Sequence, residues 1–160
     1  MAPSTTTALV ITPDAFLQHW QGHRRVTRRY IEVFPEEAMF KYSIGGMRTF
    51  AQFVMEFVGM GVPTLRGMTT GAWDSEKLPT PDTKSEMLNL WDKNTEEINR
   101  LFAQIPPDGF QKSHNAFGQW EMKGHELLLY IIDNEIHHRA QGSVYLRSVG
   151  IEPPAFYDRS

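Results

Sequence analysis

Apolar side chains recur at alternating spacings of three and four residues in four stretches of the chain, as in helices with one buried face. The pattern predicts helices over residues 12–34, 47–62, 82–105 and 123–149. No comparable run predicts a set of strands. Four amphipathic helices bury their apolar stripes most simply as an all-α four-helix bundle, and 160 residues are enough for one domain.

Glycine, proline and short polar runs divide these stretches. Gly59–Pro63 is expected to end or kink the second helix, ahead of a long loop over residues 67–81. Residues 1–11 contain the polar run Ser4 to Thr7 and no helix cap, and they predict an N-terminal arm beside the bundle. In residues 109–122 polar residues separate Phe110, Phe117 and Trp120, so a hairpin or an extended crossover is expected before the last helix.

The charge balance argues against nucleic acid and anionic membranes as partners. Lys and Arg together number 16 and Asp and Glu 19, which gives a net charge of −3. One basic cluster interrupts this balance, and the acidic residues close to it favour a solvated helix face over a DNA-binding surface. The cluster consists of Arg24, Arg25, Arg28 and Arg29.

The residue inventory excludes several classes of chemistry. Without cysteine there is no disulfide, thiolate nucleophile or thiolate metal ligand. No nucleophile elbow and no glycine-rich phosphate loop is present, so a serine hydrolase or a nucleotide enzyme has no support. The longest apolar run, 127–132, is too short to span a bilayer, and no Lys or Arg precedes Arg24, so we expect a cytoplasmic protein.

Polar residues within the predicted apolar stripes are the candidates for chemistry. Asn134 and His138 are four residues apart and lie on one helix face, where two side chains can converge on a metal ion. Glu56, inside an apolar stretch, is the candidate third ligand, and His23 is a candidate fourth. The alternative is a set of hydrogen-bonded core groups, with Glu56 paired to Arg48, Arg139 or His138. On this reading His137 is a solvated neighbour.

Two blocks of sequence resemble the DinB-like superfamily of bacterial four-helix bundles. The stronger block is residues 137–147 followed by Gly150 and 153–154, with paired histidines, Arg, a small residue, Gln, and then Tyr-Leu-Arg. The second block, residues 46–50, resembles the opening of that family's second helix. The resemblance implies an up-down-down-up bundle with an irregular or hairpin segment before the last helix.

The same resemblance implies a divalent metal, often nickel or zinc, held by one histidine of the second helix and two of the last. Carried over to this chain, those positions are Glu56, Asn134 and His138, and only one of them is histidine. Fewer nitrogen donors weaken the binding of nickel, copper or zinc relative to ions that prefer oxygen. A modified metal site and an empty polar cluster both remain open, with His23, Asn94 and Gln141 as candidate outer partners.

Two functions follow from these alternatives. The first is a metal-dependent hydrolase or a thiol-dependent transferase acting on a small molecule, with no catalytic residue assigned. The second is a non-catalytic, stress-associated dimeric scaffold or small-ligand-binding bundle with a vestigial metal site. A homodimer is expected because more apolar residues look exposed than one small bundle can bury. These residues are Trp73, Phe110, Phe117, Phe156 and Tyr157.

Overall fold

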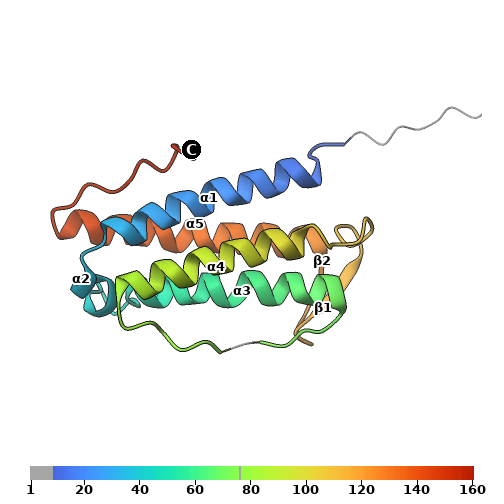
Figure 1. Ribbon diagram of the computed structural model, residues 1–160, viewed down its shortest axis with the longest axis horizontal. Coiled ribbons are helices and arrows are strands. Elements are labelled where there is room, and N and C mark those ends of the chain that lie inside the picture. Colours follow the sequence, from blue (N-terminus) through green and yellow to red (C-terminus); the bar gives the residue numbers. More distant parts are fainter. Residues whose placement is uncertain (1–8, 76) are drawn as a thin grey trace, which may run out of the picture.

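The computed structural model describes residues 9–75 and 77–160, and this part of the chain is mostly helical (Figure 1). The predicted arm over residues 1–11 therefore lies largely outside the described residues. Four long helices and one short helix, α2, follow one another along the chain. They are α1 (Pro13–Val33), α2 (Glu36–Lys41), α3 (Phe50–Thr70), α4 (Lys84–Phe102) and α5 (Gly124–Ser148).

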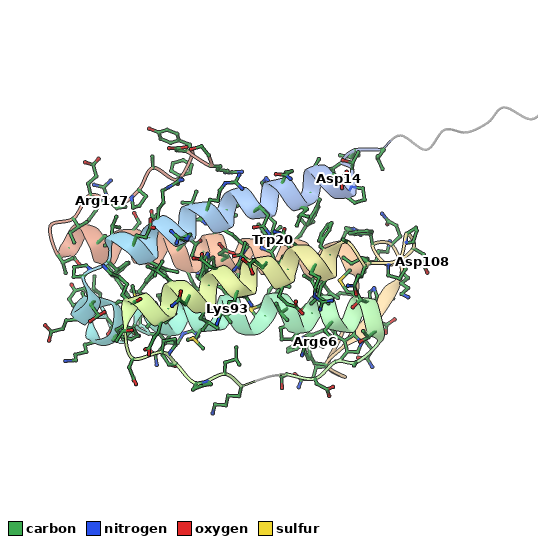
Figure 2. All side chains as sticks on the ribbon, in the orientation of Figure 1. Asp14, Trp20, Arg66, Lys93, Asp108 and Arg147 are labelled. Carbon is green, nitrogen blue, oxygen red and sulfur yellow. The ribbon has the colours of Figure 1, made fainter. Side chains whose placement is uncertain are left out.

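The four long helices lie side by side, and α1 and α3 each pack against both α4 and α5. Figure 1 shows α1 and α5 running in one direction and α3 and α4 in the other. The apolar core forms two clusters, around Phe50 in one half of the bundle and around Trp20 in the other. Trp20 lies inside the bundle, as Figure 2 shows. Buried polar residues of α1 separate the two clusters, among them His23 and Arg24.

The second helix does not end at Gly59–Pro63, because α3 continues to Thr70 with Pro63 inside it. The side chains beyond Pro63 are buried in the second core cluster, and this packing compensates for the hydrogen bond that proline cannot donate. The helix ends at Gly71, whose φ of 80° is left-handed and favours glycine. The loop that was predicted from residue 67 therefore starts later.

The other helix ends lie within three residues of the predicted ones. Thr12 and Thr83 cap α1 and α4 by accepting hydrogen bonds from backbone N–H groups of the first turn. The segment before α5 is a hairpin, with strand β1 (Ser113–Ala116) antiparallel to β2 (Trp120–Lys123). After α5, the C-terminal segment folds back alongside α1 (Figure 1). Over the described residues, no helix has the length and apolar character needed to cross a membrane.

Candidate functional site

Side chains from α3 and α5 meet in a small polar cluster where these two helices pack together. Asn134 Nδ2 donates a hydrogen bond to Glu56 Oε1 over 3.0 Å, and His138 Nε2 lies 3.4 Å from the same oxygen. Asn134 and His138 share one face of α5 because they are one helical turn apart. The structure therefore brings together all three residues that the sequence singled out. Their role as metal ligands stays a prediction.

Arg48, just before the start of α3, completes the cluster. Its guanidinium forms an ion pair with Glu56, and its Nη2 lies 3.3 Å from His138 Nε2. The guanidinium carbon is also 5.1 Å from the centre of the Phe53 ring. Of the ion-pair partners considered for Glu56, Arg48 and His138 are the ones it contacts. A positive group of the protein thus contacts both the carboxylate and the imidazole, which also lie against each other.

The orientation of His138 is fixed on both sides of its ring. Its Nδ1 lies 2.6 Å from Gln141 Oε1, and because an amide oxygen only accepts, Nδ1 carries the proton. Nε2, on the other side of the ring, lies close to both Arg48 and Glu56. The ring stacks on Phe53, with 4.6 Å between ring centres. Gln141 is therefore an outer partner of this histidine, as predicted, and His137 beside it is exposed.

The environment of Glu56 favours its charged form. Burial by itself raises the pKa of this carboxyl, but hydrogen bonds from Arg48 and Asn134 and the charges of Arg48 and His138 outweigh it and leave the pKa below the usual range. The side chain is 26% exposed. Glu56 is therefore an ionised, half-buried carboxylate with a permanent counter-charge.

The arrangement suits the guanidinium better than a divalent metal. One oxygen of Glu56 faces Arg48, the amide of Asn134 turns an N–H toward the other, and His138 supplies a single imidazole nitrogen. Within residues 9–75 and 77–160, no three His, Asp or Glu side chains are grouped so that they could hold a metal ion. As they are arranged, these side chains do not fit the metal that the resemblance implied.

Two of the predicted outer partners, His23 and Asn94, lie in a different polar network. His23 is buried on α1, and its Nδ1 accepts a hydrogen bond from Arg139 Nη2 over 3.1 Å. Asn94 on α4 accepts from Arg24 Nη2 over 3.0 Å and donates to the carbonyl of Val58. The prediction that they support the Glu56 cluster is therefore wrong. They are core residues with partners of their own.

The centre of this second network is a buried carboxylate that the sequence analysis missed. Glu135 is 1% exposed, and its oxygens lie 4.0 Å from Arg24 Nη1 and 3.7 Å from Arg139 Nη1. Thr27 donates its hydroxyl proton to the same carboxylate. The available signal was the spacing of Glu135 and Arg139, four residues apart and one position beyond Asn134 and His138.

The predicted solvated face of α1 also needs correction. Arg24 is buried, with its guanidinium 3.8 Å above the Trp91 ring and hydrogen bonds to Thr95. Arg25 and Arg29 donate to backbone carbonyl oxygens of the C-terminal segment. Arg28 pairs with an aspartate of α4 and with a glutamate one turn further along α1. All four arginines serve contacts within the chain, which further disfavours DNA binding.

A cleft opens beside the Glu56 cluster, between α3, α5 and the hairpin. It encloses about 580 Å³, and Glu56 lies at its edge together with Met60 and Thr64. Four aromatic residues contribute most of the flat apolar surface of its walls. They are Trp73, Phe117, Trp120 and Tyr130. The shape and lining suit a small molecule with an apolar or aromatic body.

Comparisons with known proteins agree with this architecture. Residues 113–160 match the model of the DinB family. The uncharacterized protein YrdA of Bacillus subtilis (strain 168) is 23% identical over 148 residues, which cover 91% of this chain and 88% of that protein.

Two crystal structures share the fold. A DinB-like protein of Bacillus subtilis, YjoA, aligns with a TM-score of 0.70 and 18% identity over 88% of this chain and 96% of its own. A DinB-like protein of Bacillus cereus ATCC 10987 aligns with a TM-score of 0.72 and 22% identity over 90% and 97%. The resemblance to the DinB-like superfamily, predicted from the last helix, is therefore confirmed by a family match at the C-terminal end and by the fold of most of the chain.

Proposed function

We propose that this protein is an up-down-down-up bundle that binds a small apolar or aromatic molecule in the cleft between α3, α5 and the hairpin. The metal site of the fold is vestigial on this proposal, because Arg48 takes the place of the ion. The supporting observation is the position of the Arg48 guanidinium, which contacts both Glu56 and the Nε2 of His138.

The charge of the cluster explains why a metal is not needed. A half-buried carboxylate requires a positive partner, and a guanidinium bound to it remains charged at any physiological pH. To coordinate an ion, Glu56 and His138 would first have to lose Arg48, and this loss opposes metal binding. The cluster instead supplies a fixed polar edge to an apolar cleft, which orients a bound molecule.

Metal analysis tests the first half of the proposal. Untagged protein is dialysed against Ni²⁺ or Zn²⁺, and bound metal is measured by elemental analysis, for the wild type and for His138→Ala and His137→Ala. His137 is the matched control because it is exposed on the same helix. We expect less than stoichiometric metal in all three proteins. One equivalent that persists in His137→Ala and disappears in His138→Ala would overturn the vestigial site and favour the metal-dependent enzyme.

A cleft-filling variant tests the second half. Gly59 lies in the cleft wall, and a Cβ added to it meets nothing within 4 Å, so Gly59→Leu fills the cleft without a clash at its base. Indole serves as a neutral aromatic probe, detected by NMR shifts of the cleft residues. We expect Gly59→Leu to abolish these shifts, and Val144→Leu, on an exposed part of α5 outside the cleft, to leave them unchanged. Equal shifts in both variants would refute binding in this cleft.

A further inference from the structure

A second cavity lies on a different flank of α5, between α1, α5 and the C-terminal segment that folds back over them (Figure 1). It encloses about 800 Å³. Ile136, Arg139 and Ser143 of α5 line it, whereas the first cleft is lined by Leu127, Tyr130 and Ile131. The two spaces therefore share no residue, and this cavity is independent of the proposed function.

Cationic side chains dominate the polar lining of this cavity. Arg139, Arg147 and Arg159 line it, and the one carboxylate among the lining residues is that of Glu152. Arg147, labelled in Figure 2, lies near the end of α5 beside the C-terminal segment. Arg159 also hydrogen-bonds to His19 Nδ1 over 3.2 Å. The lining thus carries an excess of positive charge in a space partly screened from water.

Buried residues behind the cavity wall add to this excess of positive charge. Arg24 and Arg139 are both buried, and the carboxylate they share is that of Glu135 alone. Burial, with the charges of Arg139, Arg159 and His19, lowers the pKa of His23 to about 3. His23 is therefore neutral at any physiological pH because its surroundings repel a further proton. A buried surplus of positive charge is costly unless an anion lies close to it.

Arg139 has hydrogen-bonding capacity left for such an anion. Its Nη1 donates to the carbonyl of His23 and to the hydroxyl of Thr27, and its Nη2 donates to His23 Nδ1. A guanidinium has five N–H donors. The hydrogen bonds of Arg139 within the described part of the chain leave its Nε unused, and this nitrogen is not a sealed-off donor, because the buried side-chain nitrogen without a partner there is Trp20 Nε1. This donor is available to a group in the cavity that Arg139 lines.

The rest of the lining is apolar. Tyr30 and Ile136 contribute from the helices, and Pro153, Pro154, Phe156 and Tyr157 contribute from the C-terminal segment. Arg25 and Arg29 hold this segment by its backbone oxygens, in addition to the hydrogen bond between Arg159 and His19.

We propose that this cavity binds a small organic carboxylate with an apolar body, whose carboxylate contacts Arg139, Arg147 and Arg159 and whose body lies against the prolines and aromatic rings. A carboxylate matches the planar donors of arginine and neutralises the surplus charge. The apolar body gains from contact with Phe156 and Tyr157, which are otherwise 67% and 76% exposed.

Binding of 3-phenylpropionate, measured by calorimetry at constant ionic strength, tests the proposal. The neutral amide of the same acid is the control ligand, and NMR shifts of the Arg139 Nε–H and of the backbone amides of residues 152–159 locate the site. We expect the carboxylate to bind and to shift these signals, and the amide to bind about tenfold more weakly or not at all, since it lacks the charge that strengthens each hydrogen bond.

Substitutions of arginines at the rim of the cavity test the proposal without removing a core residue. Arg147→Gln and Arg159→Gln each remove one cation from the cavity, and we expect each to weaken carboxylate binding about tenfold. Arg100→Gln, paired with Glu97 on α4, is the matched control and should bind like the wild type. Absence of binding at millimolar concentrations, equal binding of acid and amide, or wild-type affinity in both rim variants would overturn the proposal.

Discussion

Replacing Glu135 by glutamine is the most direct test of the buried polar network. The substitution keeps the size of the side chain and removes its charge. Glu135 is 1% exposed and lies 4.0 Å from Arg24 and 3.7 Å from Arg139, which are themselves buried. In Glu135→Gln the two guanidiniums keep their charges and lose the carboxylate between them.

The expected loss of stability follows from these distances. At an effective dielectric constant of about 20, each pair at this separation contributes about 4 kcal/mol of Coulomb attraction. The variant also avoids the cost of burying the carboxylate, which offsets part of this loss. Breaking a buried ion pair by removing one partner usually costs about 3–5 kcal/mol, and we expect Glu135→Gln to fall in this range.

Urea unfolding at pH 7, followed by circular dichroism, measures the effect. Glu97→Gln is the control, because Glu97 pairs with Arg100 in a partly exposed i,i+3 ion pair on α4. An ion pair of this kind contributes at most about 1 kcal/mol, so the control should unfold close to the wild type. If Glu135→Gln lost no more stability than Glu97→Gln, the carboxylate would not be the counter-charge of the two arginines.

Four further predictions follow from particular contacts. Gly142→Ala should destabilise the protein by at least about 1 kcal/mol in urea unfolding, because its Cβ would lie 2.6 Å from the Phe50 ring. Gly59→Ala, which has open space around the added Cβ, should instead stabilise α3 by about 0.5–1 kcal/mol. The pKa of His23 is about 3 in the folded protein and near 6.5 in the unfolded chain, so the protein has its full stability above pH 6.5 and loses stability as the pH falls toward 3. In this window the free energy of unfolding of the wild type should fall by up to about 1.4 kcal/mol more per pH unit than that of His23→Asn. Parallel curves for the two proteins would contradict the lowered pKa. Glu56→Gln should lower the free energy of unfolding by about 1 kcal/mol near neutral pH. This difference between wild type and variant should vanish as the pH falls below the usual pKa range of a glutamate and through the lowered pKa of Glu56. Equal stability of the two proteins at every pH would contradict the ion pair. Light scattering at micromolar concentration should give the mass of a homodimer, and a monomer mass would contradict this prediction.

Most of the fold could be predicted from the spacing of apolar residues. The ends of α1, α4 and α5 lie within three residues of the predicted ones, because capping residues mark them locally. The end of α3 could not be predicted in this way. The burial of residues beyond Pro63 decides whether the helix continues there, and burial depends on helices that are distant in the sequence.

The cluster around Glu56 could be predicted from the sequence, whereas the buried network around Glu135 could not. Asn134 and His138 interrupt an apolar stripe, and this interruption made them visible. Glu135 was not singled out, and Arg139 was considered only as a partner of Glu56, because charged side chains are rarely buried in full. Arg24 was assigned to a solvated face for the same reason. These three residues are buried because they pair with each other in the folded bundle. Since they come from α1 and α5, which are distant in the sequence, no local pattern indicates the pairing.

The two polar clusters together explain how α5 is held in rotation about its axis. Consecutive residues of a helix point about 100° apart, so Asn134 and His138 face α3 while Glu135 and Arg139 face α1. Turning α5 so that Glu135 takes the place of Asn134 would bring its carboxylate against that of Glu56 and leave Arg24 without its counter-charge, and both changes are costly. An apolar stripe alone tolerates such slippage more easily. We infer that the polar residues of α5, whatever ligand each flank binds, also select the single register in which the cleft and the second cavity form.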